Sequence, residues 1–102
     1  MILQGTLEML VLRTLLEAPN HGWGIAQRVQ QMSRGVFLVQ QGSLYPALVR
    51  MKRRGWITAA WRASENNRRA RYYEITPAGL AQLEAEREEW RRTSTAVNWV
   101  LA

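Results

Sequence analysis

The segment Gln41–Arg71, QGSLYPALVRMKRRGWITAAWRASENNRRAR, holds most of the charge of this 102-residue chain. Its last 22 residues, 50–71, contain eight basic side chains and one acidic side chain, hence a net charge of +7. The whole chain has a net charge of +6, so the other 80 residues sum to about −1. Charge concentrated in this way indicates a polyanionic partner, either a nucleic acid or an anionic membrane.

The first half of this segment predicts a helix with a basic outer surface. Ser43 is a suitable N-cap, Pro46 falls within the first turn, and Gly55 follows the helix end. One face of the helix is apolar and consists of Leu44, Ala47, Leu48 and Met51. The rest of the helix carries Tyr45, Val49, Arg50, Lys52 and Arg53. A helix with such a surface suits the major groove of DNA.

The second half of the segment predicts a β-hairpin with an arginine-rich loop. The expected strands are Trp56–Arg62 and Arg71–Ile75, because apolar residues alternate along both. The tip is expected at Asn66-Asn67, since asparagine tolerates a positive φ. Arginines beside such a tip can enter a narrow minor groove.

Other side chains of the hairpin favour structural roles. Trp56 and Trp61 are expected to pack beneath it. Arg62 and Arg71 have two open interpretations: they contact DNA, or they pair across the strands with Glu65 or Glu74.

The N-terminal part of the chain predicts two further helices. The first has Thr6 as its N-cap and an inward stripe made of Leu3, Leu7, Leu10, Val11, Thr14 and Leu15. Met9 and Leu12 lie off this stripe and would be exposed on a lone helix, or they cover a second interface. The second helix is expected over Trp23–Met32, with an inward face of Ile25, Val29 and Met32. Val36–Val39 predicts a brief strand or an extended turn, and residues 40–42 a turn.

The C-terminal 26 residues predict one long helix, with Thr76 as N-cap and Pro77 as its first residue. Steps of three and four residues define a seam along it: Leu80, Leu83, Arg87, Trp90, Ser94, Val97 and Leu101. The helix is too long for the small domain to cover, so a second copy of the chain is the simplest partner. The expected homodimer interface contains Leu83, Arg87, Trp90, Val97 and Leu101.

Composition excludes several classes of protein. The chain has no cysteine and one histidine, His21, which is expected to be a loop residue with a satisfied hydrogen bond. We expect no catalytic residues, no cofactor and no metal, so the protein is not predicted to be an enzyme. The apolar N-terminal stretch has no basic leader and is interrupted by Glu8 and Arg13, which argues against a signal peptide. There is no apolar run of about 18 residues, so we expect a cytoplasmic protein without a membrane partner.

Several motifs together resemble the PadR-like winged-helix transcriptional regulators, in their short form with a single C-terminal helix. The likeness lies in His21–Ala26, in Gly42–Leu48, in Gly55 and Trp61, in Arg69–Tyr73 and in Ile75–Gly79. Two positions depart from the usual pattern. Trp23 stands where most members have tyrosine, and Lys52 stands where an acidic residue is common. The lysine adds charge to the surface that would read DNA, so the operator sequence cannot be borrowed from relatives.

The resemblance implies a mainly α fold with a small β-hairpin (α+β), namely a winged helix-turn-helix over residues 1–76 and a dimerisation helix over 77–102. It also implies a homodimeric repressor that binds double-stranded DNA, with the third helix in the major groove and the hairpin as a wing. The expected DNA-binding residues are Gln41, Ser43, Tyr45, Pro46, Arg50, Lys52, Arg53, Asn67, Arg68, Arg69 and Arg71.

Two other functions stay open. Five tryptophans in a chain of this size also suit a sensor of small hydrophobic compounds, with Trp90 and Trp99 stacking on a planar or cationic effector. Alternatively, the C-terminal helix serves a protein-interaction module whose basic face binds RNA or an acidic partner.

Overall fold

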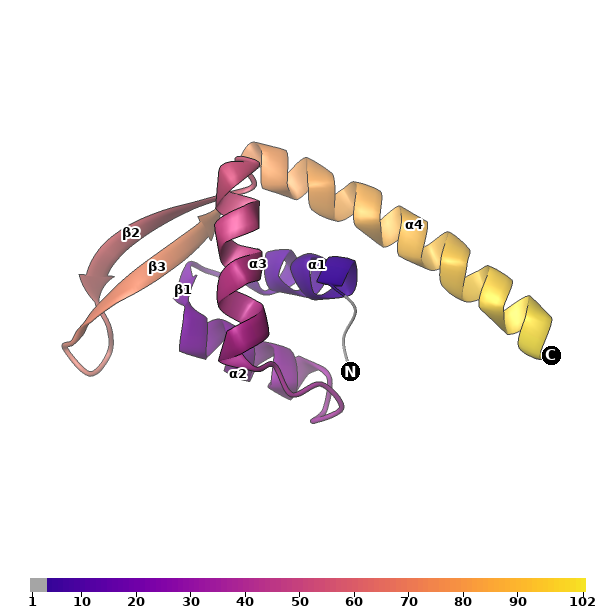
Figure 1. The fold of residues 1–102 in the computed structure, drawn as a ribbon, viewed down its shortest axis with the longest axis horizontal. Helices are drawn as coiled ribbons and strands as arrows, with labels where there is room; N and C mark the ends of the chain where they lie inside the picture. Colours follow the sequence, from indigo (N-terminus) through magenta and orange to yellow (C-terminus); the bar gives the residue numbers. More distant parts are fainter. Residues whose placement is uncertain (1–3) are drawn as a thin grey trace.

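The computed structural model describes residues 4–102 as four helices and a three-stranded sheet, which confirms the mainly α, α+β fold. The elements are α1 (Gln4–Leu15), β1 (Asn20–His21), α2 (Gly22–Met32), α3 (Gln41–Arg53), β2 (Ile57–Ala63), β3 (Arg69–Ile75) and α4 (Pro77–Leu101). Helices α1, α2 and α3 form the body, the β2–β3 hairpin projects from one side of it, and α4 projects from the other (Figure 1). The molecule is therefore elongated and measures 51 × 28 × 22 Å.

The sheet is antiparallel with the strand order β1-β3-β2. The hairpin was predicted, but β1 was not: His21 was expected in a loop and instead pairs with Tyr72 of β3. This two-residue strand fastens the hairpin to the N-terminus of α2.

The core lies where α1 meets the other three helices. Leu12 is fully buried and Met9 is half-buried against the core, so the alternative in which these two residues cover a second interface is the correct one. Because α1 contacts α2, α3 and α4, more than one of its stripes is covered. Met32 was expected inward but is exposed at the end of α2.

Three predicted boundaries differ from the structure. Thr6 lies inside α1, which already includes Gln4, so Thr6 is not the N-cap. Residues 40–42 are not a turn: α3 begins at Gln41 after the N-cap Gln40, so Ser43 lies in the first turn and Pro46 in the helix interior. No strand forms over 36–39, which leaves the extended loop as the correct alternative. Leu3 lies outside the described residues.

The end of α3 and the start of α4 are tied together. Gly55 has a φ of +77°, and the N–H groups of Gly55 and Trp56 donate to the carbonyls of Lys52 and Met51, which closes α3 with a Schellman motif. Thr76, the predicted N-cap of α4, accepts a hydrogen bond from the Gly79 N–H at 3.0 Å and donates to the Gly55 carbonyl at 2.6 Å. Helix α4 therefore leaves the body in a direction fixed by these contacts.

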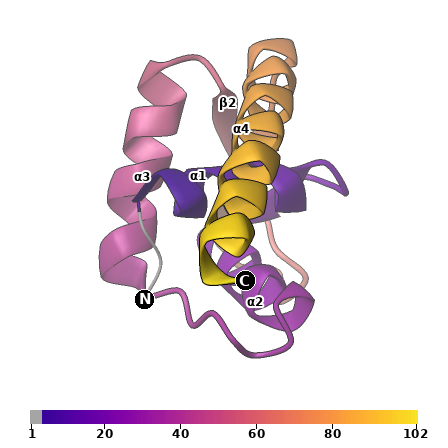
Figure 2. The same cartoon turned by 90° about the vertical axis from the view of Figure 1, so that its right-hand side faces the viewer.

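Most of α4 is not packed against other described residues of the chain. Among the described residues of this helix, only Gly79 and Leu83 are buried. Leu83 was predicted at the dimer interface, but it is fully buried in the core of its own chain. Beyond it the helix extends away from the body, toward the viewer in Figure 2. Its residues Trp90, Val97, Trp99, Val100 and Leu101 are all exposed.

Candidate nucleic-acid interface

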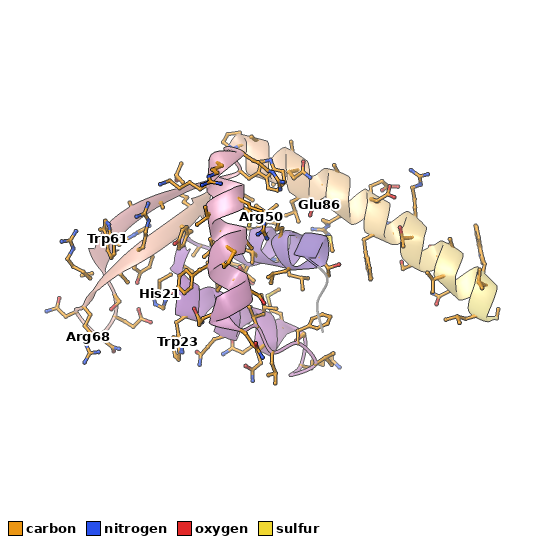
Figure 3. The ribbon with its side chains drawn as sticks, in the orientation of Figure 1. His21, Trp23, Arg50, Trp61, Arg68 and Glu86 are labelled. Carbon is orange, nitrogen blue, oxygen red and sulfur yellow. The ribbon has the colours of Figure 1, made fainter. Side chains whose placement is uncertain are left out.

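The residues expected to bind DNA lie on α3 and on the hairpin beside it (Figure 3). Those of the first two turns of α3 are exposed: Gln41, Ser43, Tyr45 and Pro46. Lys52 and Arg53 are exposed at the other end of the same helix. The hairpin contributes the exposed residues Asn67, Arg68 and Arg69, and the half-buried Arg71. The two elements thus present one cationic surface, as the sequence predicts.

Arginines and aromatic rings interleave along the hairpin. The guanidinium carbon of Arg62 lies 4.5 Å from the ring centre of Tyr72. Arg69 and Arg71 lie 5.3 and 5.8 Å from the ring of Trp61, which is the cross-strand neighbour of Arg71. The alternative in which Arg62 and Arg71 pair with Glu65 or Glu74 is therefore wrong, because their contacts are to rings. The rings orient these guanidinium groups without neutralising them.

Trp61 itself is not packed beneath the hairpin. More than half of its surface is exposed, whereas Trp56 is half-buried against the core, so the prediction holds for Trp56 alone. The hairpin extends beyond the helical body, and its outer end has no core beneath it (Figure 1).

The hairpin turn has the predicted tip. Asn67 adopts a φ of +60°, its N–H donates to the Ser64 carbonyl at 2.8 Å, and the Ser64 N–H donates to the Arg68 carbonyl at 2.7 Å. This turn directs Arg68 away from the body (Figure 3).

His21 joins the hairpin loop to α2. Its Nδ1 accepts a hydrogen bond from the Gly24 N–H at 3.0 Å, which caps α2, so the predicted hydrogen bond is confirmed. Its Nε2 lies 3.7 Å from a carboxylate oxygen of Glu65, which also accepts a hydrogen bond from the Tyr72 hydroxyl. The pKa of Glu65 is lowered, mainly because its own backbone N–H donates to the carboxylate, and attraction to His21 adds to this effect.

A buried carboxylate anchors the basic end of α3. Glu8 of α1 is 3% exposed, and its oxygens lie 3.8 Å from Arg50 Nε and 3.4 Å from Arg54 Nη1. Arg54 also stacks on Trp56 at 5.1 Å. Arg50 is therefore drawn toward α1, whereas Lys52 and Arg53 face outward. This role of Glu8 was not predicted, although an acidic residue within an apolar helix was its signal.

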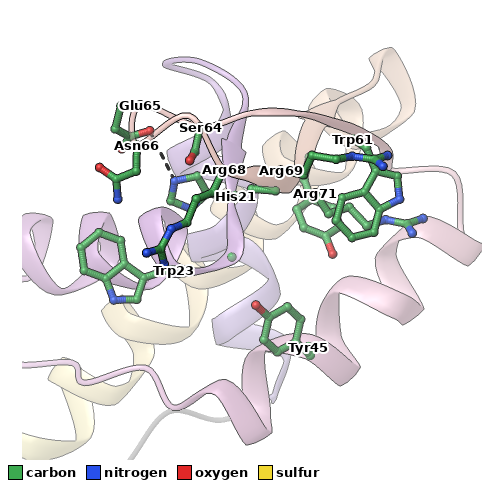
Figure 4. A pocket seen from close by; sticks show the side chains of 13 residues that line it. His21, Trp23, Tyr45, Trp61, Ser64, Glu65, Asn66, Arg68, Arg69 and Arg71 are labelled. Atoms are coloured by element: carbon green, nitrogen blue, oxygen red, sulfur yellow. Dashed lines mark ion pairs between the residues drawn. The ribbon is translucent and has the colours of Figure 1, made fainter.

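An open groove separates the start of α3 from the hairpin (Figure 4). Its volume is about 640 Å³, and three large exposed aromatic side chains open onto it: Trp23, Tyr45 and Trp61. Arg68, Arg69 and Arg71 line it from the hairpin side. Trp23 had been noted only as a departure from the family pattern, because nothing in the sequence places the start of α2 opposite the hairpin.

Helix α4 presents the remaining predicted interface residues in its exposed part: Arg87, Trp90, Val97 and Leu101. Its charged side chains form ion pairs within the helix, between Glu88 and Arg91 and between Glu89 and Arg92. Trp90 borders a second groove, of about 340 Å³, between α4 and the start of α1. Trp99, the other predicted effector residue, is exposed near the C-terminus of the helix.

Two further findings concern the described residues alone. Within 4–102, no group of three or more acidic, histidine or cysteine side chains could hold a metal ion. No helix over the same range is long and apolar enough to cross a membrane.

Comparison with known proteins agrees with this arrangement. Residues 11–85 match the model of the transcriptional regulator PadR-like family. A PadR-like transcriptional regulator from Bacillus cereus is 32% identical, with a TM-score of 0.81 over 96% of this chain and 93% of that one. A PadR family regulator from Clostridium difficile is 28% identical, with a TM-score of 0.79 over 94% and 98% of the two chains. A transcriptional regulator from Clostridium thermocellum is 26% identical, with a TM-score of 0.84 over 93% and 92%.

The family match spans most of the chain, including α2, α3, the hairpin and the start of α4. These elements carry the cationic surface. The chain therefore belongs to the PadR-like family of transcriptional regulators and is a DNA-binding regulator.

Proposed function

We propose that the protein is a repressor that binds a pseudo-palindromic operator as a homodimer. In this mode α3 enters the major groove and the hairpin acts as a wing at the adjacent minor groove or backbone. The observation that carries the proposal is the single cationic surface made by α3 and the hairpin, whose 22 residues from 50 to 71 hold a net charge of +7. Such a surface releases counterions from DNA when it binds phosphates.

The two ends of α3 have different proposed roles. Recognition helices contact base edges through their N-terminal residues, so Gln41, Ser43, Tyr45 and Pro46 are proposed to meet bases and the adjoining backbone. Lys52 and Arg53 are proposed to bind phosphates, together with Asn67, Arg68, Arg69 and Arg71 of the hairpin. Arg50 is proposed to contribute less directly to DNA binding, because Glu8 holds it toward α1.

The dimer is proposed to form through residues 77–102, with residues 1–76 as the DNA-binding unit. Helix α4 exposes Trp90 and Val97 on the predicted seam and Leu101 at its end. Burying this apolar surface against a second copy is favourable. Two α3 helices in such a dimer would reach half-sites about one DNA turn, or ~34 Å, apart.

The proposal is tested with the purified full chain and the DNA upstream of its own gene. Sedimentation should give a dimer, and fluorescence anisotropy should show saturable binding that weakens steeply with salt. A monomer that ignores this DNA at low ionic strength would contradict the proposal. Competition between duplex DNA and structured RNA separates it from the RNA-binding alternative, which requires a preference for RNA.

One observation favours a second candidate function, the binding of a planar cationic effector beside Trp90. The groove between α1 and α4 is lined by Met9 and Trp90 and also by Glu86. One carboxylate oxygen of Glu86 is buried and has no hydrogen-bond partner among the described residues. The other oxygen of Glu86 accepts a hydrogen bond from Gln82 Nε2 at 2.9 Å. A buried carboxylate oxygen without a partner favours a cation, and an indole ring favours a flat one. Quenching of tryptophan fluorescence by a planar dye cation without DNA, abolished in Trp90→Leu, would support this function.

A further inference from the structure

The groove between α3 and the hairpin has a definite place in the proposed complex. If α3 occupies a major groove and the hairpin the adjacent minor groove, the sugar–phosphate strand that divides those grooves must pass between the two elements. We infer that this strand lies in the groove, with Trp23 and Trp61 as DNA-contacting residues that hold it on either side of Tyr45. The inference rests on the proposed function and extends it to two tryptophans with no assigned role.

The three aromatic side chains come from three elements and open onto the same space. Trp23 belongs to α2, Tyr45 to α3 and Trp61 to β2, and they are 59%, 47% and 56% exposed. In Figure 4, Trp23 lies near one end of the groove, and Trp61 lies near the other end beside Arg69 and Arg71. Each ring offers an apolar face for a deoxyribose and one N–H or O–H donor for a phosphate oxygen.

The charge of the groove matches a phosphodiester strand. Three arginines line it, and its one carboxylate, Glu65, is already engaged by His21 and by the Tyr72 hydroxyl. Arg69 and Arg71 are held over the Trp61 ring, which keeps their positive groups close to an aromatic face. An uncharged apolar occupant would leave these cations facing it without compensation, whereas a phosphate strand satisfies both kinds of side chain.

At the floor of the groove, the start of α2 lies against the Tyr45 ring. A Cβ atom added at Gly22, the first residue of α2, would lie 2.9 Å from the Tyr45 hydroxyl oxygen. The Tyr45 side chain thus bridges the space between α3 and the start of α2. Trp23 follows directly and is stacked on His21 at a ring separation of 6.3 Å. This places an indole where the DNA strand would enter.

Trp23→Ala is the sharpest test, since Trp23 is 59% exposed and takes no part in the stacking of Arg69 and Arg71 on Trp61. The probe is a duplex selected by the parent protein from random sequences, with binding followed by anisotropy. We expect binding about tenfold weaker, equivalent to about 1.4 kcal/mol, for selected and unrelated duplexes alike. The salt slope should stay unchanged because the lost group is uncharged. Trp23→Phe, which keeps an aromatic face, should lose less affinity for DNA than Trp23→Ala.

Leu16→Ala provides the matched control, since it removes an exposed apolar side chain outside the groove and should bind DNA like the parent. Duplexes with a single methylphosphonate locate the contact on the strand. The parent should lose affinity when a phosphate between the α3-contacted major groove and the hairpin-contacted minor groove is neutralised. For the Trp23→Ala variant, the same methylphosphonate should reduce the DNA affinity by a smaller factor than it does for the parent.

The outcomes separate the inference from the function on which it rests. If the parent binds duplex DNA but Trp23→Ala and Trp61→Ala bind it equally well, the inference is overturned and the proposed function stands. If the parent binds no duplex DNA, both the inference and the proposed function are refuted. If an alanine variant fails to fold, the inference is tested by Trp23→Phe and by the methylphosphonate map of the parent. A map in which no phosphate between the two grooves affects the affinity overturns the inference.

Discussion

Replacing Gly79 by alanine tests how α4 is joined to the body. Gly79 lies in the first turn of α4, where helix propensity alone predicts that alanine stabilises the protein by up to about 1 kcal/mol. The structure predicts the opposite. A Cβ atom at this position would lie 2.1 Å from the Trp56 carbonyl oxygen and 2.9 Å from Cγ1 of Ile75. The obstructing atom is backbone, so a small side-chain movement gives no relief.

The expected loss of stability follows from the atoms that must move to make room for the alanine Cβ. The Trp56 carbonyl accepts a hydrogen bond from the Thr76 N–H at 3.0 Å, and displacing it weakens that bond, at a cost of about 1 kcal/mol. Overpacking adds about 1–3 kcal/mol. After the helix-propensity gain is subtracted, Gly79→Ala should lower the free energy of unfolding by roughly 1–3 kcal/mol. A domain of this size should then melt roughly 5–20 °C lower.

Thermal unfolding followed by circular dichroism measures this effect, with all variants at one protein concentration because a dimer's melting temperature depends on it. Gly42→Ala is the control, since Gly42 also lies in a first helical turn and a Cβ there would meet nothing within 4 Å. That variant should melt at or slightly above the parent temperature. If Gly79→Ala were as stable as Gly42→Ala, the close packing of α4 on Trp56 would be refuted.

Three further predictions concern charge. Glu8→Gln should lower the free energy of unfolding by about 1–3 kcal/mol in urea titrations, because two arginines of α3 lose their buried carboxylate; an unchanged midpoint would contradict the anchoring role. Arg68→Ala should weaken binding to all duplexes alike and reduce the salt slope by about one, whereas a change confined to one sequence would indicate base reading instead. Glu65 should titrate below its ordinary value of 4.5 in an NMR titration. Its lowered pKa means that its stabilising contribution is present above pH 4.5 and is lost as the pH falls through the folded-state value. In His21→Ala the Glu65 pKa should rise, and an unchanged pKa would show that His21 does not act on it.

Much of the fold follows from local chemistry that the sequence displays. The four apolar residues of α3 are buried as their spacing predicts, Gly55 ends that helix with a positive φ, and Thr76 caps α4. Each of these depends on contacts within a few residues. The concentration of charge on α3 and the hairpin also follows, because it belongs to adjacent segments.

Features that depend on tertiary contacts could not be predicted from the sequence. Leu12 lies off the predicted stripe, and the sequence could not say which elements would cover it, because α1 has three helical neighbours. Strand β1 has only two residues and depends wholly on β3, which no periodicity could indicate. Leu83 fits the heptad seam, yet the body of its own chain covers it. Likewise, the groove beside Trp23 joins three separate elements, and their proximity exists only in the folded chain.

The central claim is that a dimer presents two copies of the cationic surface to one duplex. Hydroxyl-radical footprinting of a duplex selected by the protein tests it most directly. The claim predicts two protected windows related by a dyad, with centres about one helical turn, or ~34 Å, apart on one face of the DNA. A single protected window without a symmetry-related partner would contradict it.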